Sequence, residues 1–223
     1  MTRSPSLDEF ANIYRHGFAR VAACTLPVTM ADPRANAAAI LERARHVGEQ
    51  GAAVALFPEL SLTGYAIDDL LLQDVLLREV EAALVELARG TADLRPVVVV
   101  GAPLRNGNRL FNCAVVLHDG CVLGIAPKSY LPNYREFYEK RHFAPGDDQR
   151  GGTIEVGGEV VPFGVDLLFR SVGALPVTFH VEICEDMWVP VPPSAKAALA
   201  GATVLANLSG SPITIGRADT NTL

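Results

Sequence analysis

Three apolar stretches of the sequence each end at a side chain that could take part in covalent chemistry. The stretches and the residues that follow them are 52–57 with Glu59, 121–126 with Lys128, and 178–183 with Cys184. In proteins built on sheets, functional side chains gather just beyond strand ends, where the backbone is rigid and the side chains are free. We therefore expect Glu59, Lys128 and Cys184 to converge at one edge of a sheet.

A thiol, a carboxylate and an ammonium group together have the chemistry needed to cleave an amide. A free thiol has a pKa of about 8.5 and must lose its proton before it attacks, which a neighbouring carboxylate can assist. Attack on an amide carbonyl places negative charge on the oxygen, and an ammonium group stabilises that charge in a dry site. We therefore assign Cys184 as nucleophile, Glu59 as general base and acid, and Lys128 as the group that stabilises the oxyanion.

The other three cysteines have a simpler interpretation. Cys24, Cys113 and Cys121 lie in apolar runs, where a cysteine is usually a small buried apolar residue. Cys184 differs, because its apolar run ends on it and a polar, acidic segment follows. The glutamate and the lysine, taken singly, would be ordinary surface charges, so the coincidence of all three at strand ends carries the assignment.

Two other arrangements use the same residue types. A cysteine–histidine pair would use His180, but four residues along one strand separate it from Cys184 by about 13 Å. His142, in a long polar loop, is not excluded by spacing, although a solvated or half-packed histidine is its ordinary interpretation. A metal site on His180, Glu182, Cys184 and Asp186 would need ligands two apart on one strand, and such ligands rarely close a tetrahedral shell. We expect no metal.

The sequence around these residues predicts an α/β fold with mixed sheets. Apolar periodicity favours a helix that opens at Asp32-Pro33 and ends before Gly51, a second helix over 68–89 and a short one over 194–199. Strands are expected at 18–26, 52–57, 96–103, 110–117, 121–126, 175–183 and 202–206, and a further hairpin at 151–158. Tight turns at 106–107 and 119–120 make the three middle strands antiparallel. The polar, aromatic segment 127–148 is a candidate functional loop.

Composition narrows the class of protein and its partners. The 223 residues carry a net charge of -6, which argues against nucleic acid and anionic membranes as partners. We expect a single domain, because the length suits one core and no linker divides the chain. The first fifteen residues lack the apolar run of a signal peptide, and no stretch approaches the ~20 apolar residues of a membrane helix. Four scattered cysteines favour a reducing compartment, the cytoplasm.

The reactive residues lie in three sequence blocks that resemble a known family. The blocks are FPEL at 57–60 with TGY at 63–65, PKSYLP at 127–132 and EICED at 182–186. In this order they resemble the signature blocks of the nitrilase, or carbon-nitrogen hydrolase, superfamily. The resemblance covers about residues 18–217 and implies a Glu-Lys-Cys triad on an α-β-β-α sandwich.

Two further segments, 128–146 and NLSGSP at 207–212, resemble the glutaminase domain of glutamine-dependent NAD synthetases. That domain hydrolyses glutamine and passes ammonia to a synthetase domain, which amidates adenylated deamido-NAD with ATP and Mg; the hydrolysis itself needs no cofactor. The resemblance implies that Glu139 positions Lys128. It also implies that glutamine is held by Tyr134, Ser211, Arg217, Tyr65, Phe137 and Glu185. Glu185 suits the ammonium and Arg217 the carboxylate of the substrate.

The resemblance also has limits that set expectations for the chain. No Ser-Gly-Gly pyrophosphate-binding loop is present in it, so a synthetase domain or chain is an implied partner. The sequence stops at Leu223, soon after the last site motif, so we expect a single domain over 1–223 that lacks its last strands, with an unpaired edge and marginal stability. A homo-oligomer that pairs through sheet-covering helices is implied. The alternatives are a free-standing amidase for another small amide and an inactive fragment.

Overall fold

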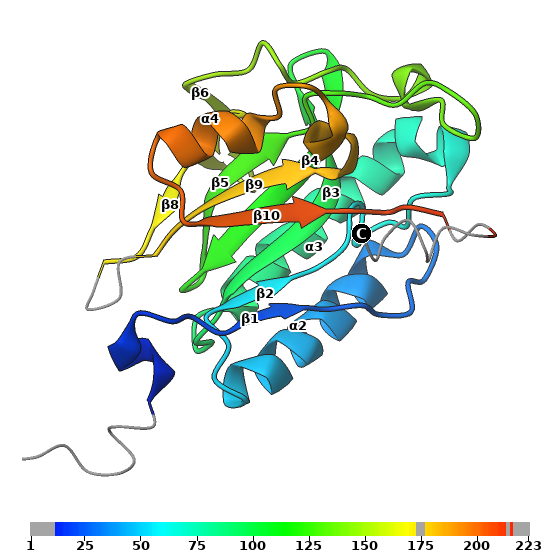
Figure 1. The fold of residues 1–223 in the computed structure, drawn as a ribbon. Helices are drawn as coiled ribbons and strands as arrows, with labels where there is room; N and C mark the ends of the chain where they lie inside the picture. The colour runs from blue at the N-terminus through cyan, green and yellow to red at the C-terminus, as the bar shows by residue number, and fades with distance from the viewer. Residues whose placement is uncertain (1–11, 173–176, 213–214, 216–223) are drawn as a thin grey trace, which may run out of the picture.

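The computed structural model describes residues 12–172, 177–212 and 215, and it contains two sheets packed face to face (Figure 1). The larger sheet has the order β1 (Val21–Ala23), β2 (Val54–Leu56), β3 (Val97–Asn106), β4 (Arg109–His118), β5 (Cys121–Pro127), β7 (Glu159–Phe163) and β6 (Gly152–Val156). The smaller sheet has the order β10 (Val204–Leu208), β9 (Thr178–Ile183) and β8 (Phe169–Arg170).

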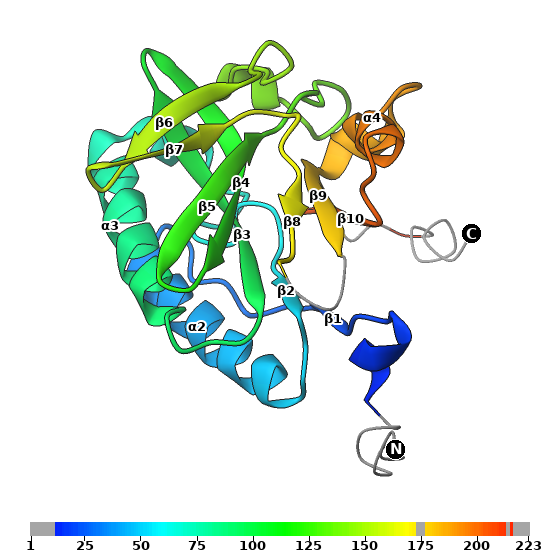
Figure 2. The same ribbon diagram turned by 90° about the vertical axis from the view of Figure 1, so that its left-hand side faces the viewer.

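Helices cover the outer faces of both sheets, which gives the α-β-β-α layers that the family resemblance implies. Helices α2 (Pro33–Glu49) and α3 (Asp74–Gly90) lie against the larger sheet, and α4 (Pro193–Leu199) lies beyond the smaller one (Figure 2). The short 3₁₀ helices are η1 (Ile13–His16), η2 (Asp68–Leu72), η3 (Glu139–Arg141) and η4 (Cys184–Trp188). Within the described residues, no helix is both long and apolar enough to cross a membrane.

Strand direction brings the ends of distant strands to one edge. β1, β2 and β3 are parallel, whereas β3, β4 and β5 form an antiparallel meander, as the two predicted turns require. β2 and β5 therefore run the same way and end at the same edge of the larger sheet. In the smaller sheet β9 is parallel to β10 and antiparallel to β8, so both sheets are mixed.

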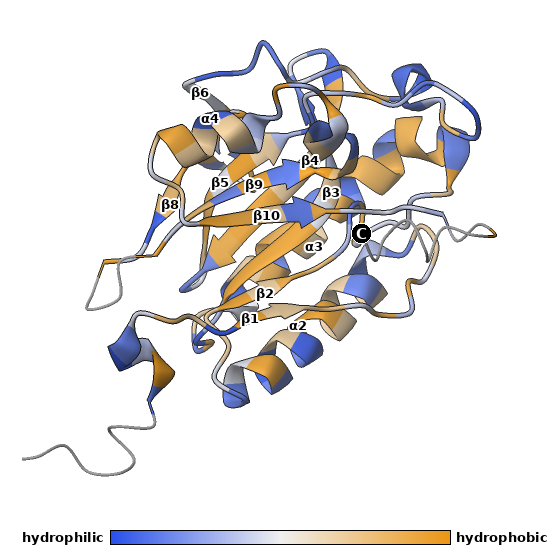
Figure 3. Ribbon diagram, in the orientation of Figure 1, coloured by the Kyte–Doolittle hydropathy of each residue, from blue (hydrophilic) through white to orange (hydrophobic). Residues whose placement is uncertain are grey.

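Burial on both faces explains why the central strands are continuously apolar. Successive side chains of a strand point to opposite faces. On β4, Phe111, Cys113 and Val115 join the core beneath α2 and α3, while Ala114 and Val116 join the core between the sheets. Figure 3 shows the same distribution, with apolar strands inside and polar residues on the outer face of α2.

Helix α2 begins and ends where the sequence predicts. The side chain of Asp32 accepts a hydrogen bond from the backbone of Ala35 at 3.0 Å, and Pro33 occupies the first turn. After the last turn, Gly51 adopts a φ of 82°, and its N–H donates to the carbonyl of Gly48 at 2.9 Å. This is the termination that the glycine predicts.

Three details of the sequence prediction are wrong. The strand expected at 18–26 is limited to Val21–Ala23, because its ladder partner β2 is only three residues long. The helix expected at 68–89 is broken at Gln73, whose extended backbone (ψ 121°) separates η2 from α3. Cys121 is exposed rather than buried, since it is the first residue after the turn that opens β5.

Gly101 on β3 allows close contact with the segment that carries Glu59. A Cβ at Gly101 would overlap the backbone nitrogen of Leu60 and lie 2.7 Å from both the carbonyl carbon of Glu59 and the oxygen of Pro58. These are backbone atoms, which cannot rotate away. Leu60 itself has a φ of 51°, a conformation that L-residues adopt only when their surroundings hold them there.

We predict that Gly101→Ala destabilises the fold by at least about 2 kcal/mol, because overpacked backbone must shift. Urea denaturation monitored by circular dichroism measures this loss. Gly152→Ala is the control, since its Cβ would meet only the carbonyl oxygen of Phe163 at 3.3 Å on an edge strand. Equal stability of the two variants would contradict the packing role of Gly101.

Candidate active site

The structure brings Glu59 and Lys128 into direct contact at the predicted edge. Glu59 follows β2 and Lys128 follows β5, and the Lys128 Nζ lies 2.6 Å from the Glu59 Oε1. Both side chains are fully buried. The shared strand direction of β2 and β5 therefore produces a buried ion pair between residues 69 apart in sequence.

Glu139, in the long loop, is the second carboxylate on this lysine. Its Oε1 lies 2.6 Å from the Lys128 Nζ and accepts a hydrogen bond from the Tyr65 hydroxyl at 2.6 Å. Burial alone would lower the pKa of Lys128, but the charges of Glu59 and Glu139 outweigh it and raise that pKa. Lys128 is therefore a permanent cation. Burial, opposed by Lys128, raises the pKa of Glu139 above its usual range.

Two hydrogen-bond donors, one from a side chain and one from the backbone, complete the surroundings of Glu59. The Asn112 Nδ2 donates to the Glu59 Oε1 at 2.7 Å, and the Gly210 N–H donates to the Oε2 at 3.0 Å. The Asn112 carbonyl also accepts from the Lys128 N–H at 2.8 Å. The sequence analysis missed Asn112, although a polar side chain in the middle of an apolar strand was a usable signal, since buried polar groups need partners.

Cys184 begins η4 at the end of β9 and has a φ of 46°, in the left-handed region. The Asn207 Nδ2 donates to its carbonyl at 3.3 Å. Burial and the charge of Glu59 raise the pKa of the Cys184 thiol, while Lys128, the Ser209 side chain and the Gly210 backbone lower it. The thiol is therefore within electrostatic reach of both Glu59 and Lys128. With a raised pKa it is protonated at neutral pH, so its attack requires a base.

Asp186 is a second site-adjacent residue that the sequence analysis did not assign. Its buried carboxylate accepts hydrogen bonds from the backbone N–H groups of Ser129, Tyr130 and Ile183 at 2.8–3.0 Å. Burial raises the pKa of Asp186 to about 7, although the three N–H groups lower it. Asp186 links the segment after β5 to the segment around Cys184.

The predicted substrate-binding residues are brought together only in part. The Tyr134 hydroxyl donates to the Glu185 Oε2 at 2.9 Å, and the Phe137 ring meets the Tyr134 ring edge-on at 5.8 Å. Tyr65 and Phe137 line a cavity of about 130 Å³ together with Glu139. Ser211 is exposed beyond β10, and Arg217 lies outside the described residues. The structure thus clusters four of the six residues around the loop 127–148.

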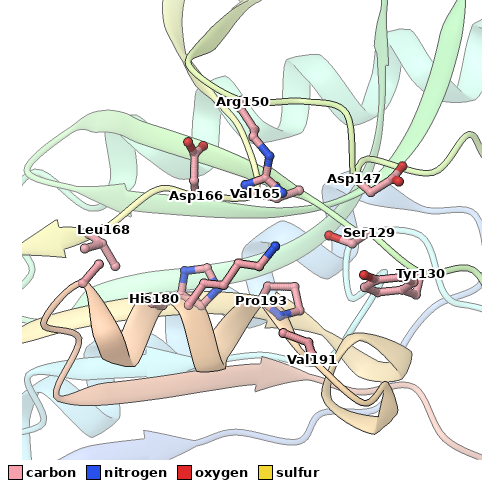
Figure 4. A pocket seen from close by; sticks show the side chains of 13 residues that line it. Ser129, Tyr130, Asp147, Arg150, Val165, Asp166, Leu168, His180, Val191 and Pro193 are labelled. Atoms are coloured by element: carbon pink, nitrogen blue, oxygen red, sulfur yellow. The ribbon is translucent and has the colours of Figure 1, made fainter.

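A larger cavity of about 200 Å³ lies behind Ser129 and Tyr130 and is not lined by Glu59, Lys128 or Cys184 (Figure 4). His180 lies at this cavity, and its Nδ1 is 3.0 Å from the carbonyl oxygen of Leu167. This contact ties the histidine ring to the segment just before β8. In the described part of the chain, no group of three or more His, Cys, Asp and Glu side chains is placed to hold a metal ion.

The electrostatics of the thiol give a test of its environment. We predict that Glu59→Gln moves the pH profile of Cys184 alkylation by iodoacetamide to lower pH, because it removes a negative charge that opposes the thiolate. A shift on the order of one pH unit corresponds to about 1.4 kcal/mol of repulsion. Mass spectrometry follows the reaction in a Cys121→Ser background, which removes the exposed thiol. A pH profile that is unchanged or moved to higher pH would show that the charge of Glu59 does not oppose ionisation of this thiol.

Comparisons with known proteins give the same family as the site residues. Residues 20–220 match the family model described as carbon-nitrogen hydrolase. The chain is 63% identical over 210 residues to the glutamine-dependent NAD(+) synthetase of Mycobacterium tuberculosis, covering 94% of this chain and 31% of the relative. It is 61% identical over 211 residues to that of Mycobacterium leprae, covering 95% and 31%. The chain thus spans about a third of the length of these relatives.

Solved structures show the same fold. A glutamine-dependent NAD(+) synthetase from Cytophaga hutchinsonii is similar with a TM-score of 0.78 at 26% identity, covering 92% of this chain and 32% of that one. An amidase of the nitrilase superfamily from Nesterenkonia AN1 has a TM-score of 0.66 at 22% identity, covering 92% and 70%. Sequence blocks, layer order and family match agree: this chain belongs to the carbon-nitrogen hydrolase family.

Proposed function

We propose that this chain hydrolyses the side-chain amide of glutamine through a thioester on Cys184 and that the released ammonia serves NAD synthesis. One observation carries the chemistry: a buried Lys128 is held between Glu59 and Glu139 beside a buried thiol. The choice of glutamine is supported by the 63% identity to glutamine-dependent NAD(+) synthetases. The proposed reaction uses these residues in two halves.

In the first half of the reaction, Glu59 takes the proton of the Cys184 thiol as the sulfur bonds to the amide carbon. The carbonyl oxygen becomes an oxyanion. The Lys128 ammonium has three N–H donors, of which two face Glu59 and Glu139 among the described residues, so the third is available to the oxyanion. The C–N bond then breaks, and Glu59 returns its proton to the nitrogen. Ammonia leaves and a thioester remains.

In the second half of the reaction, water hydrolyses the thioester. Glu59 takes a proton from the water as the water oxygen bonds to the thioester carbon. Lys128 again stabilises the oxyanion. The C–S bond breaks, and the sulfur recovers the proton, which regenerates Cys184 and releases glutamate. We propose that these steps use water as the only co-reactant and need no cofactor.

Recognition of the amino-acid end of glutamine is assigned to the loop 127–148 and the chain after Cys184. Glu185 is half-buried and hydrogen-bonded to Tyr134, so its carboxylate is held where it can pair with the substrate ammonium. Ser211 and Arg217 are proposed to meet the carboxylate end. Glu139 is proposed to position Lys128 without touching the reacting atoms.

The synthetase step is proposed to belong to a separate domain or chain. The relatives are about three times as long as this chain, and ATP and Mg would act in their remaining part. We also propose that the protein is cytoplasmic and forms a homo-oligomer. Four free cysteines fit a reducing compartment.

We predict that the chain releases ammonia from glutamine with a kcat/KM at least about 100-fold higher than from butyramide, since only glutamine engages the charged groups of the site. A coupled glutamate dehydrogenase assay measures the rates. Cys184→Ala is the control and should be inactive on both amides. Comparable rates on the two amides would instead favour a free-standing amidase, and an inactive chain would favour a fragment without catalysis.

Glu185→Gln tests the recognition of the substrate ammonium. We expect the KM for glutamine to rise about 10-fold or more, because a charge-assisted hydrogen bond contributes about 1.5–3 kcal/mol. The rate on butyramide should stay unchanged, since butyramide has no ammonium. Steady-state kinetics on both amides separates these effects. An equal loss on both substrates would show that Glu185 acts on the triad rather than on the substrate.

A further inference from the structure

The buried side chain of Asp186 ties the backbone directly after Lys128 to the segment that contains Cys184. Its Oδ1 accepts from the Ser129 N–H at 3.0 Å and from the Tyr130 N–H at 2.8 Å. Its Oδ2 accepts from the Ile183 N–H at 3.0 Å. The residue is 1% exposed, so water does not substitute for these bonds. Removal of a partner from a buried donor costs about 1–3 kcal/mol.

These bonds cross between the two sheets. β5, which ends just before Lys128, belongs to the larger sheet, and β9, which ends just before Cys184, belongs to the smaller one. In the described chain, side-chain packing rather than a backbone ladder joins β5 to β9. Apolar packing is not directional, and it leaves some freedom to slide. The carboxylate fixes the two strand ends by directional bonds.

The carboxylate also supports the strained backbone at the nucleophile. Cys184 has a positive φ, which an L-residue keeps only when neighbouring groups over-determine it. Asp186 binds the N–H of Ile183 on one side of Cys184, and Asn207 binds the Cys184 carbonyl on the other. Loss of one of these supports frees the turn to relax.

We propose that Asp186 is a positioning residue that sets the Cys184 sulfur against the Lys128 ammonium for amide cleavage. The proposal rests on the proposed function. Asp186 makes its hydrogen bonds to backbone groups and not to reacting atoms, so it acts through the geometry of the two segments. A displacement of about 1 Å between reacting groups lowers a rate by about 100-fold.

The test is Asp186→Asn, which keeps the shape but replaces one acceptor oxygen with an NH₂ group that faces an N–H donor. We expect kcat for glutamine to fall about 10–100-fold while KM changes by less than about 3-fold, because the substrate-binding groups stay in place. Labelling of Cys184 by a glutamine-like diazo-ketone at saturation should slow by the same factor. Circular dichroism and a thermal melt establish that the variant is folded.

Glu182→Gln is the matched control. Glu182 is also a buried acid two residues from Cys184, and its Oε2 accepts from the Ser194 N–H at 2.9 Å, which anchors α4 instead of the Lys128 segment. We expect it to lose stability comparably but to keep kcat within about 3-fold. Equal kcat losses in both variants would overturn the proposal, as would a wild-type kcat in Asp186→Asn or a rise confined to KM.

The variant Asp186→Glu and the substrate butyramide provide two further tests. If Asp186→Asn does not fold, Asp186→Glu retains two acceptor oxygens but displaces them by one methylene, and a folded variant with wild-type kcat would contradict the proposal. If the wild-type chain does not hydrolyse glutamine, the proposed function fails, and the comparison of the variants is made on butyramide. Equal kcat of wild type and Asp186→Asn on butyramide would then overturn the role of Asp186 separately.

Discussion

The buried ammonium of Lys128 is the interaction on which the rest of this structure depends. A charge without water is costly unless it is paired and hydrogen-bonded, and here two carboxylates meet one cation. The excess negative charge is held by further donors, from Asn112 and Gly210 to Glu59 and from Tyr65 to Glu139. Loss of Lys128 would leave two buried carboxylates without a cation. The site is therefore also a constraint on the fold.

The residues of this buried cluster come from different parts of the chain. Glu59 follows β2, Lys128 follows β5, Asn112 on β4 donates to Glu59, and the long loop supplies Glu139. The mixed strand directions are needed, because only strands that run the same way deliver their ends to one edge. The close approach of β3 at Gly101 and two residues with positive φ, Leu60 and Cys184, then set the final positions. Such strained positions are typical of functional sites.

The buried and the exposed residues of the candidate site are held differently. Glu59, Lys128 and Cys184 are buried at strand ends, where packing fixes them, whereas Tyr134 and Glu185 are at least partly exposed beside an irregular loop. Changes in exposed loop residues disturb the core little, so the surroundings of the buried cluster can vary without loss of the cluster itself. The loop is itself anchored, because Arg141 forms a bidentate pair with Asp69 of η2. The pair joins η2 to the segment that carries Glu139.

The sequence by itself indicated mixed strands covered by helices and antiparallel middle strands, and it singled out Glu59, Lys128 and Cys184 as candidates. These follow from local patterns: apolar runs, turn dipeptides, and polar residues directly after strands. The two-sheet layer order was implied by the family resemblance. Only the tertiary structure decided the roles of Asn112 and Asp186, because their partners lie 53 and 57 residues away. It also decided the short β1, the break at Gln73 and the exposure of Cys121, which depend on neighbouring elements. Local periodicity encodes which elements form, whereas their ends and buried polar contacts depend on the residues that pack against them.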